Sequence, residues 1–173
     1  AVLSGIDEPD ALIHTLEQKP EELENQPLTD GDRIEPFEAV LTVTGPYQSF
    51  GFLEGIIDGI LARRTSIATN VYDVIQAAGV SGKQKPIIFM GDRDDHFMQQ
   101  AGDGYAAYIG GSQAQATHAM NEWWGVKGMG TMPHALIQLF KGDVVVAAEA
   151  YHVTFPEDDL IVLVDYNNDV ITD

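Results

Sequence analysis

Short apolar runs alternate with helical periodicity along most of the chain. Between residues 47 and 78, apolar residues recur at spacings of three and four, which predicts one long helix or two in succession. Further helices are predicted after the polar turn 91–95 up to residue 108 and over 112–124, 132–140 and 143–155, with Ser112 and Thr131 as candidate N-caps. Strands are predicted over 38–44, 86–90, 127–130 and 160–165.

This alternation is typical of parallel strands joined by right-handed crossovers, and it predicts an α/β fold. The first 37 residues are different: they are acidic, contain Pro9, Pro20 and Pro27, and have one short helical period. We interpret them as an ordered connector that contributes no core element. The expected divisions are 1–37 as this connector or part of a small domain, 38–84 as a strand and long helix, and 85–173 as the first part of an α/β barrel.

Composition narrows the possible functions. The chain is 45% hydrophobic and 21% charged, as expected of a folded protein, and its net charge of -18 disfavours a nucleic-acid surface. The absence of cysteine excludes thiolate zinc sites and thiol nucleophiles. No apolar run is long enough for a membrane span, and residues 1–10 lack a secretory signal, so we expect a cytoplasmic protein that binds no membrane.

Polar side chains follow three of the predicted strands. These groups are Arg93 after the strand 86–90, Thr131 and His134 after 127–130, and Asp165 at the end of 160–165. Because the carboxyl ends of parallel strands meet at one edge, we expect the imidazole, guanidinium and carboxylate to open onto one cavity. These side chains are suited to binding or reacting with a phosphate or a carboxylate.

Each candidate also has a structural interpretation. His134 follows a glycine-rich turn and could act as nucleophile or base, or it could only cap the turn. Arg93 suits a bidentate anion but also has acidic neighbours with which to pair. Asp165 could bind magnesium or ribose, or be a turn residue. Adjacent Arg63 and Arg64 suggest a phosphate patch or a solvated helix face, and His96 suggests a surface residue at a helix start.

A set of short motifs carries a family resemblance. In order they are Glu38-Ala-Val-Leu-Thr-Val-Thr-Gly-Pro46, Thr65-Ser-Ile-Ala-Thr69, Phe89-Met-Gly-Asp-Arg93, Tyr108-Ile-Gly-Gly111, Gly130-Thr-Met-Pro-His134 and Leu163-Val-Asp165. Their order and spacing resemble the central part of nicotinate phosphoribosyltransferases. The resemblance implies the type II phosphoribosyltransferase fold, in which a small α/β domain packs against an irregular α/β barrel.

The resemblance also implies roles for individual residues. His134 matches the histidine that the family phosphorylates with ATP, and Arg93 matches an arginine near the nicotinate and phosphoribosyl groups. Thr131 would lie against phosphate, and Asp165 near ribose or Mg²⁺, which accompanies phosphoribosyl diphosphate and ATP. The chain departs from the family in having Asp94 where a second arginine is common.

The expected function is ATP-dependent formation of nicotinate mononucleotide and diphosphate from nicotinate and phosphoribosyl diphosphate. This is a ligase-classified step of NAD biosynthesis, performed by a homodimer or larger homo-oligomer. The family's Thr-Asp-x-Tyr and Asp-Ser-Gly-Asp segments are absent, so we expect an internal fragment that is inactive alone. Two alternatives stay open: quinolinate phosphoribosyltransferase, which decarboxylates without ATP, and a non-catalytic acidic α/β assembly module.

Overall fold

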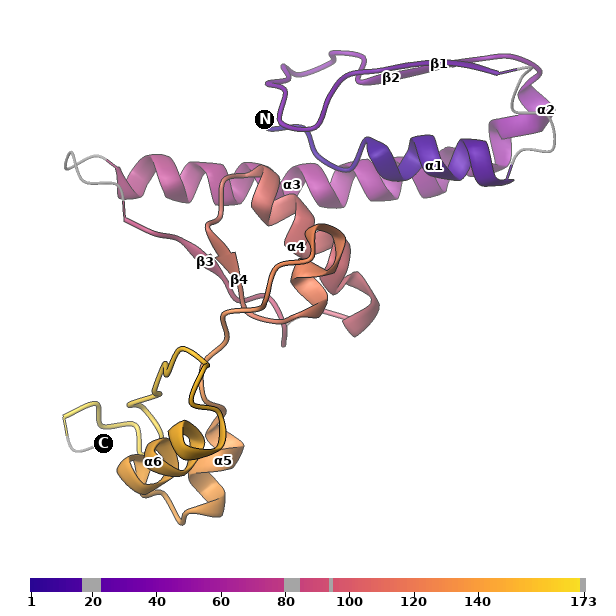
Figure 1. Cartoon of the computed structure of the whole chain (residues 1–173). Coiled ribbons are helices and arrows are strands. Elements are labelled where there is room, and N and C mark those ends of the chain that lie inside the picture. Colours follow the sequence, from indigo (N-terminus) through magenta and orange to yellow (C-terminus); the bar gives the residue numbers. More distant parts are fainter. Residues whose placement is uncertain (17–22, 80–84, 94, 172–173) are drawn as a thin grey trace. The chain divides into compact units, whose positions relative to one another are not determined.

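The computed structural model describes residues 1–16, 23–79, 85–93 and 95–171 (Figure 1). The chain divides into two compact units, Ala1–Gly128 and Met129–Asp173, which are called here the first and the second unit. The domain boundaries expected after residues 37 and 84 stay predictions. No helix in the described ranges has the length and apolar character needed to cross a bilayer.

The first unit is built along helix α3 (Glu54–Ala78), with helix α1 (Asp7–Leu16) packed against it (Figure 1). Helix α2 (Tyr47–Phe50) and the 3-10 turn η2 (Gly51–Leu53) lead into α3, so the prediction of one long helix or two in succession over 47–78 is confirmed as helical structure along that range. Strands β1 (Glu24–Pro27) and β2 (Leu41–Thr44) pair antiparallel, with Glu24 opposite Thr44.

The prediction that residues 1–37 contribute no core element is wrong. The side chains of Leu3, Ile6 and Ile13 are at most 3% exposed. Ile13 packs with Leu53 and Ile57 in one core cluster. The proline and acidic content suggested a connector, but Val2, Leu3, Ile6 and Ile13 lie inside the fold, where their burial stabilises it.

The second half of the first unit forms a small parallel sheet with helices. Strand β3 (Ile88–Phe89) pairs with β4 (Ala114–Gln115), and the connection between them holds the 3-10 turn η3 (Phe97–Gln99) and helix α4 (Gln100–Ile109). The predicted helix 112–124 is wrong, because Ser112 donates its hydroxyl to the carbonyl of Ala114 (2.8 Å) and residues 114–115 pair as a strand. Only Ala119–Trp124 is helical, as the 3-10 element η4.

The second unit contains helices α5 (His134–Leu139) and α6 (Val144–Thr154). Asp143 caps α6 by accepting a hydrogen bond from the Val146 amide (3.0 Å). The predicted cap Thr131 is wrong, since Pro133 occupies that position. The buried core of this unit consists of Met132, Ile137, Val144 and Ala147.

The predicted strands 127–130 and 160–165 are not strands in the structure. The Met132 amide donates to the Ile161 carbonyl (2.9 Å), which ties the segment 160–165 to the loop before α5. A strand needs a repeating ladder to a neighbour, and this segment makes no ladder with the described residues. The described part of the chain is therefore mixed α and β without a closed barrel.

Candidate functional site

A histidine and a carboxylate meet in the second unit. His134 is the first residue of α5, and its Nε2 lies 2.9 Å from Oδ1 of Asp165. The two side chains are 37% and 55% exposed. An ionised carboxylate only accepts hydrogen bonds, so Nε2 carries the proton, and in the neutral ring the lone pair is then on Nδ1. The arrangement can present an oriented imidazole to a substrate.

Packing explains why these two residues meet. Val162, Leu163 and Tyr166 pack against the core of the second unit, and they fix the segment that carries Asp165. Met132, which is 1% exposed, anchors the loop that carries His134. Thr131 belongs to that same loop and is half-buried. The structure thus brings three of the four predicted site residues onto two neighbouring segments.

Arg93 lies in the first unit, exposed on the turn that follows β3. The turn is compact at its start, where a side-chain carbon on Gly91 would lie 2.7 Å from the ring of Phe89. Because Arg93 and the His134–Asp165 pair belong to different units, the expectation of one shared cavity stays a prediction.

Arg63 and Arg64 form neither the phosphate patch nor the solvated face that the sequence suggested. Arg63 Nε and Nη2 lie 2.8 and 2.7 Å from the two carboxylate oxygens of Asp103. Arg64 Nη1 lies 2.6 Å from the same carboxylate, and Arg64 Nε lies 2.7 Å from Glu8. Both Arg64 and Asp103 are buried, with 6% and 3% exposed.

These ion pairs tie α1, α3 and α4 together. Asp103 chiefly raises the pKa of the Arg63 guanidinium by accepting its hydrogen bonds. Sequence reasoning missed the network because the partners are 39 to 56 residues apart, and no local spacing connects them. The one local signal is the Gly102-Asp103-Gly104 run, whose small residues allow close approach to the carboxylate.

His96 has the surface role that the sequence suggested as one interpretation. It is exposed and precedes η3, where its Nδ1 accepts a hydrogen bond from the Met98 amide (3.3 Å). No group of three or more histidine, aspartate or glutamate side chains in the described ranges is arranged to hold a metal ion.

A pair of interacting acids in the first unit also escaped the sequence analysis. Burial raises the pKa of Tyr105 to about 12, and the negative charges of Asp30 and Asp7 add to the effect. The pKa of Asp30 is itself raised, mainly by burial, although its Oδ1 accepts a hydrogen bond from the Ile6 amide (2.9 Å).

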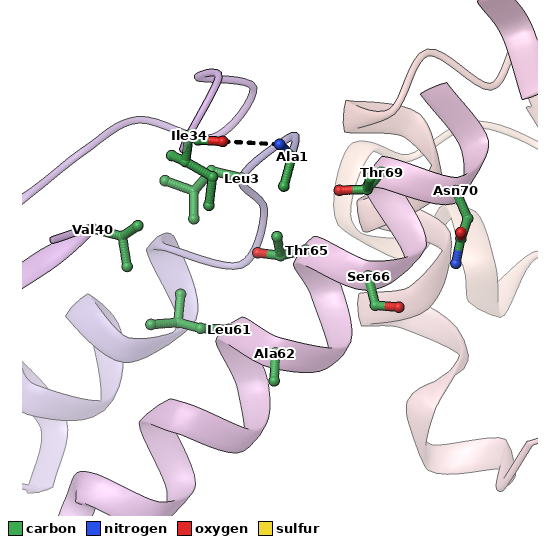
Figure 2. A pocket seen from close by; sticks show the side chains of 10 residues that line it. All are labelled: Ala1, Leu3, Ile34, Val40, Leu61, Ala62, Thr65, Ser66, Thr69 and Asn70. Atoms are coloured by element: carbon green, nitrogen blue, oxygen red, sulfur yellow. Dashed lines mark hydrogen bonds between the residues drawn. The ribbon is translucent and has the colours of Figure 1, made fainter. Parts of the chain in front are cut away.

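The first unit also has a pocket of about 430 Å³ beside α3 (Figure 2). Its lining is mostly apolar and includes Leu3, Val40 and Leu61. Thr65 and Thr69, from one of the motifs that carry the family resemblance, accept hydrogen bonds from the amides of Ser4 (3.3 Å) and Val2 (3.0 Å). These hydroxyls hold the N-terminal segment against α3, and none of the described residues that line the pocket has a charged side chain.

Comparison with known proteins points to one enzyme class. No family model matches the chain. Nicotinate phosphoribosyltransferase pncB1 of Mycobacterium tuberculosis is 32% identical over 110 residues, which are 64% of this chain and 24% of the relative. The chain therefore spans about a quarter of the length of that curated relative.

Solved structures extend the likeness to nearly the whole chain. Nicotinate-nucleotide pyrophosphorylase from Pyrococcus furiosus superposes with a TM-score of 0.78 at 32% identity, over 95% of this chain and 40% of that one. NadC from Streptococcus pyogenes shares the fold at 20% identity and a TM-score of 0.68, over 92% of this chain and 52% of that one. Human nicotinic acid phosphoribosyltransferase shares the fold at 18% identity and a TM-score of 0.68, over 83% of this chain and 34% of that one. The resemblance of this chain to nicotinate phosphoribosyltransferases is thus confirmed. The fold of the chain is that of the type II phosphoribosyltransferase structures.

Proposed function

We propose that the protein containing this chain is a nicotinate phosphoribosyltransferase that couples the transfer to ATP hydrolysis. The observation that carries the proposal is the 2.9 Å hydrogen bond between Asp165 and His134. It supplies an oriented imidazole at the position where the family resemblance places a phosphorylated histidine. The 32% identity to a named nicotinate phosphoribosyltransferase supports the same activity.

The hydrogen bond determines which ring nitrogen can react. With Nε2–H held by Asp165, the Nδ1 lone pair of His134 attacks the γ-phosphorus of ATP. The Nδ1–P bond forms as the bond from phosphorus to the β,γ-bridging oxygen breaks, and ADP leaves with that electron pair. Phosphorylation adds negative charge and acceptor oxygens beside Thr131, which can order the surrounding loops.

In the transfer itself, the nicotinate ring nitrogen attacks the anomeric carbon of phosphoribosyl diphosphate and diphosphate leaves. Arg93 provides a planar, always charged fork for the nicotinate carboxylate or the phosphoribosyl end. The Thr131 hydroxyl can donate to a phosphate oxygen. Phosphate-bound Mg²⁺ needs only one or two protein carboxylates, and the half-exposed Asp165 fits that requirement. When bound, the ion neutralises charge on the diphosphate.

The test is an assay of the full-length protein with nicotinate and phosphoribosyl diphosphate, with and without ATP. We expect His134→Ala to abolish the stimulation by ATP while slow ATP-independent transfer remains. The rate measured with ATP should therefore fall by about 100-fold or more, because His134 acts directly in the reaction. The matched control is His152→Ala, at an exposed histidine on α6 in the same unit, which should keep the stimulation. ATP stimulation that survives His134→Ala would contradict the assigned role.

One observation favours a second candidate, quinolinate phosphoribosyltransferase. The Pyrococcus neighbour is named nicotinate-nucleotide pyrophosphorylase. Nicotinate nucleotide and pyrophosphate are products of the nicotinate reaction and also of the quinolinate reaction, which releases carbon dioxide in addition. Release of labelled carbon dioxide from quinolinate, without ATP, would identify the quinolinate enzyme. Turnover of neither acid would favour an assembly module. The proposal also includes a homodimer or larger homo-oligomer, as the family resemblance implies.

A further inference from the structure

The chain is held on both sides of Arg93. At the start of the turn that carries Arg93, Gly91 lies against the ring of Phe89, and a side-chain carbon at residue 91 would approach that ring to 2.7 Å. Phe89 in turn packs against the core cluster of Val71, Ile75 and Ala107. The beginning of the turn is therefore fixed by close packing on the hydrophobic core.

On the other side of Arg93, Asp95 makes an ion pair with Arg63. The distance from Asp95 Oδ2 to Arg63 Nη2 is 2.7 Å, and the same nitrogen lies 2.7 Å from Asp103 Oδ2. An Nη2 group carries two hydrogens, so it can donate one to each carboxylate. Arg63 thus bridges Asp95 to Asp103 of α4.

The bridge has a rigid base. Arg63 also donates through Nε to Asp103 Oδ1 (2.8 Å), so its planar fork is bound to that carboxylate at two points. The side chain of Asp103 is only 4% exposed and is held in addition by Arg64 at 2.6 Å. The orientation of the Arg63 fork is therefore determined by the buried network, and Asp95 is bound at a defined place.

We propose that Arg63 is a positioning residue: through Asp95 it holds the chain just beyond Arg93, and so keeps Arg93 in position for substrate. The inference rests on the proposed function, which gives Arg93 its substrate. Arginine is required because one planar group must donate to two carboxylates at once, whereas the ammonium of lysine is a single point charge.

The kinetic test uses Asp95→Asn and Arg63→Lys in the full-length protein. Each should raise, by about two- to fivefold, the KM of whichever substrate is affected by Arg93→Lys, and should leave kcat nearly unchanged, because the pair with the half-exposed Asp95 is of moderate strength. Asp58→Asn, at an exposed position of the same helix, removes the same charge and should change neither constant.

A double variant separates positioning from simple charge removal. In the Arg93→Lys variant, residue 93 keeps its positive charge but loses the planar guanidinium fork. If Asp95 acts by orienting the fork, Asp95→Asn causes no further rise in KM there. An effect of the same size in both backgrounds would mean that only the charge of Asp95 matters, and this would overturn the inference.

Hydrogen exchange without substrate provides a readout that does not depend on the reaction. Amides of the Gly91–Arg93 stretch should exchange about two- to fivefold faster in Asp95→Asn and Arg63→Lys than in the wild type or Asp58→Asn. Unchanged exchange in both variants overturns the positioning role even if the proposed function stands. If Arg93→Lys leaves both KM values unchanged while exchange accelerates, the substrate role of Arg93 fails and the turn contact is only structural.

Discussion

Gly102 has no room for a side chain, because the Arg64 guanidinium lies directly against its backbone. A side-chain carbon at residue 102 would be 1.9 Å from Arg64 Nη2. The guanidinium is held in that position by Asp103 and Glu8. A single missing carbon therefore allows a buried charge to reach its partners.

We expect Gly102→Ala to lower the free energy of unfolding by about 2 kcal/mol, because the guanidinium must move away from its carboxylates. Urea denaturation at neutral pH measures the change. Gly59→Ala is the matched control: it lies on α3, has nothing within 4 Å of the added carbon, and should stabilise by up to about 1 kcal/mol. Equal effects of the two substitutions would contradict this account of Gly102.

The candidate site was predictable only in part at the scale of residues. Strand-end logic selected His134 and Asp165, and the structure joins them by a hydrogen bond although neither of the two predicted strands forms. The role assigned to Asp165 was ribose or magnesium binding, and its contact with an imidazole could not be deduced from spacing. The Arg63 contact with Asp103 spans 40 residues, so only the folded chain shows it.

At the scale of elements, periodicity predicted the helices well and the strands poorly. Helices α3 and α6 satisfy their own backbone groups, so a local pattern of apolar residues suffices to predict them. A strand depends on a partner elsewhere in the chain. The segments 127–130 and 160–165 were predicted as strands but make no ladder with the described residues, while the polar β1 became a strand because β2 pairs with it.

Asp103 joins three helices, and its replacement tests how much they depend on it. Asp103→Asn leaves two arginines around a neutral amide, one of them the buried Arg64, and we expect a loss of about 3 kcal/mol in unfolding free energy. Glu8→Gln should cost less, about 1 kcal/mol, since Glu8 is 21% exposed and contacts only Arg64 among these arginines. Urea titration compares the two. A smaller loss for Asp103→Asn than for Glu8→Gln would exclude a central role for Asp103.

At the scale of the whole molecule, Tyr105 makes stability depend on alkaline pH. Its pKa is raised from 10.0 to about 12 by burial and by nearby carboxylates. The folded state therefore binds the phenolic proton more tightly than the unfolded state does. This contribution is complete below pH 10 and is lost as pH rises through 12.

We accordingly expect the free energy of unfolding to fall between pH 10 and 12, and Tyr105→Phe to make that fall less steep. Urea titrations at several pH values in this window measure both slopes. The comparison with the variant is necessary because the net charge of -18 grows further at high pH and destabilises any compact state through repulsion. Identical slopes would show that Tyr105 is not responsible.

The two units differ in how much core they possess. The second unit buries Met132, Ile137, Val144 and Ala147, and it leaves large apolar side chains exposed, among them Leu139 and Val153 at 80% each. Domains of roughly 60 residues are already marginal, and Met129–Asp173 is shorter. The described part of the first unit has two buried apolar clusters and a network of buried ion pairs.

We therefore expect a peptide of residues 129–173 to show no cooperative thermal transition, while a chain of residues 1–128 unfolds in one. Burial of four residues supplies too little hydrophobic free energy to offset the conformational entropy of ordering the second unit. Circular dichroism during heating measures both. A sharp transition in the isolated peptide would show that the four buried residues suffice, and the exposed apolar side chains of α5 and α6 would then need no cover to keep that unit folded.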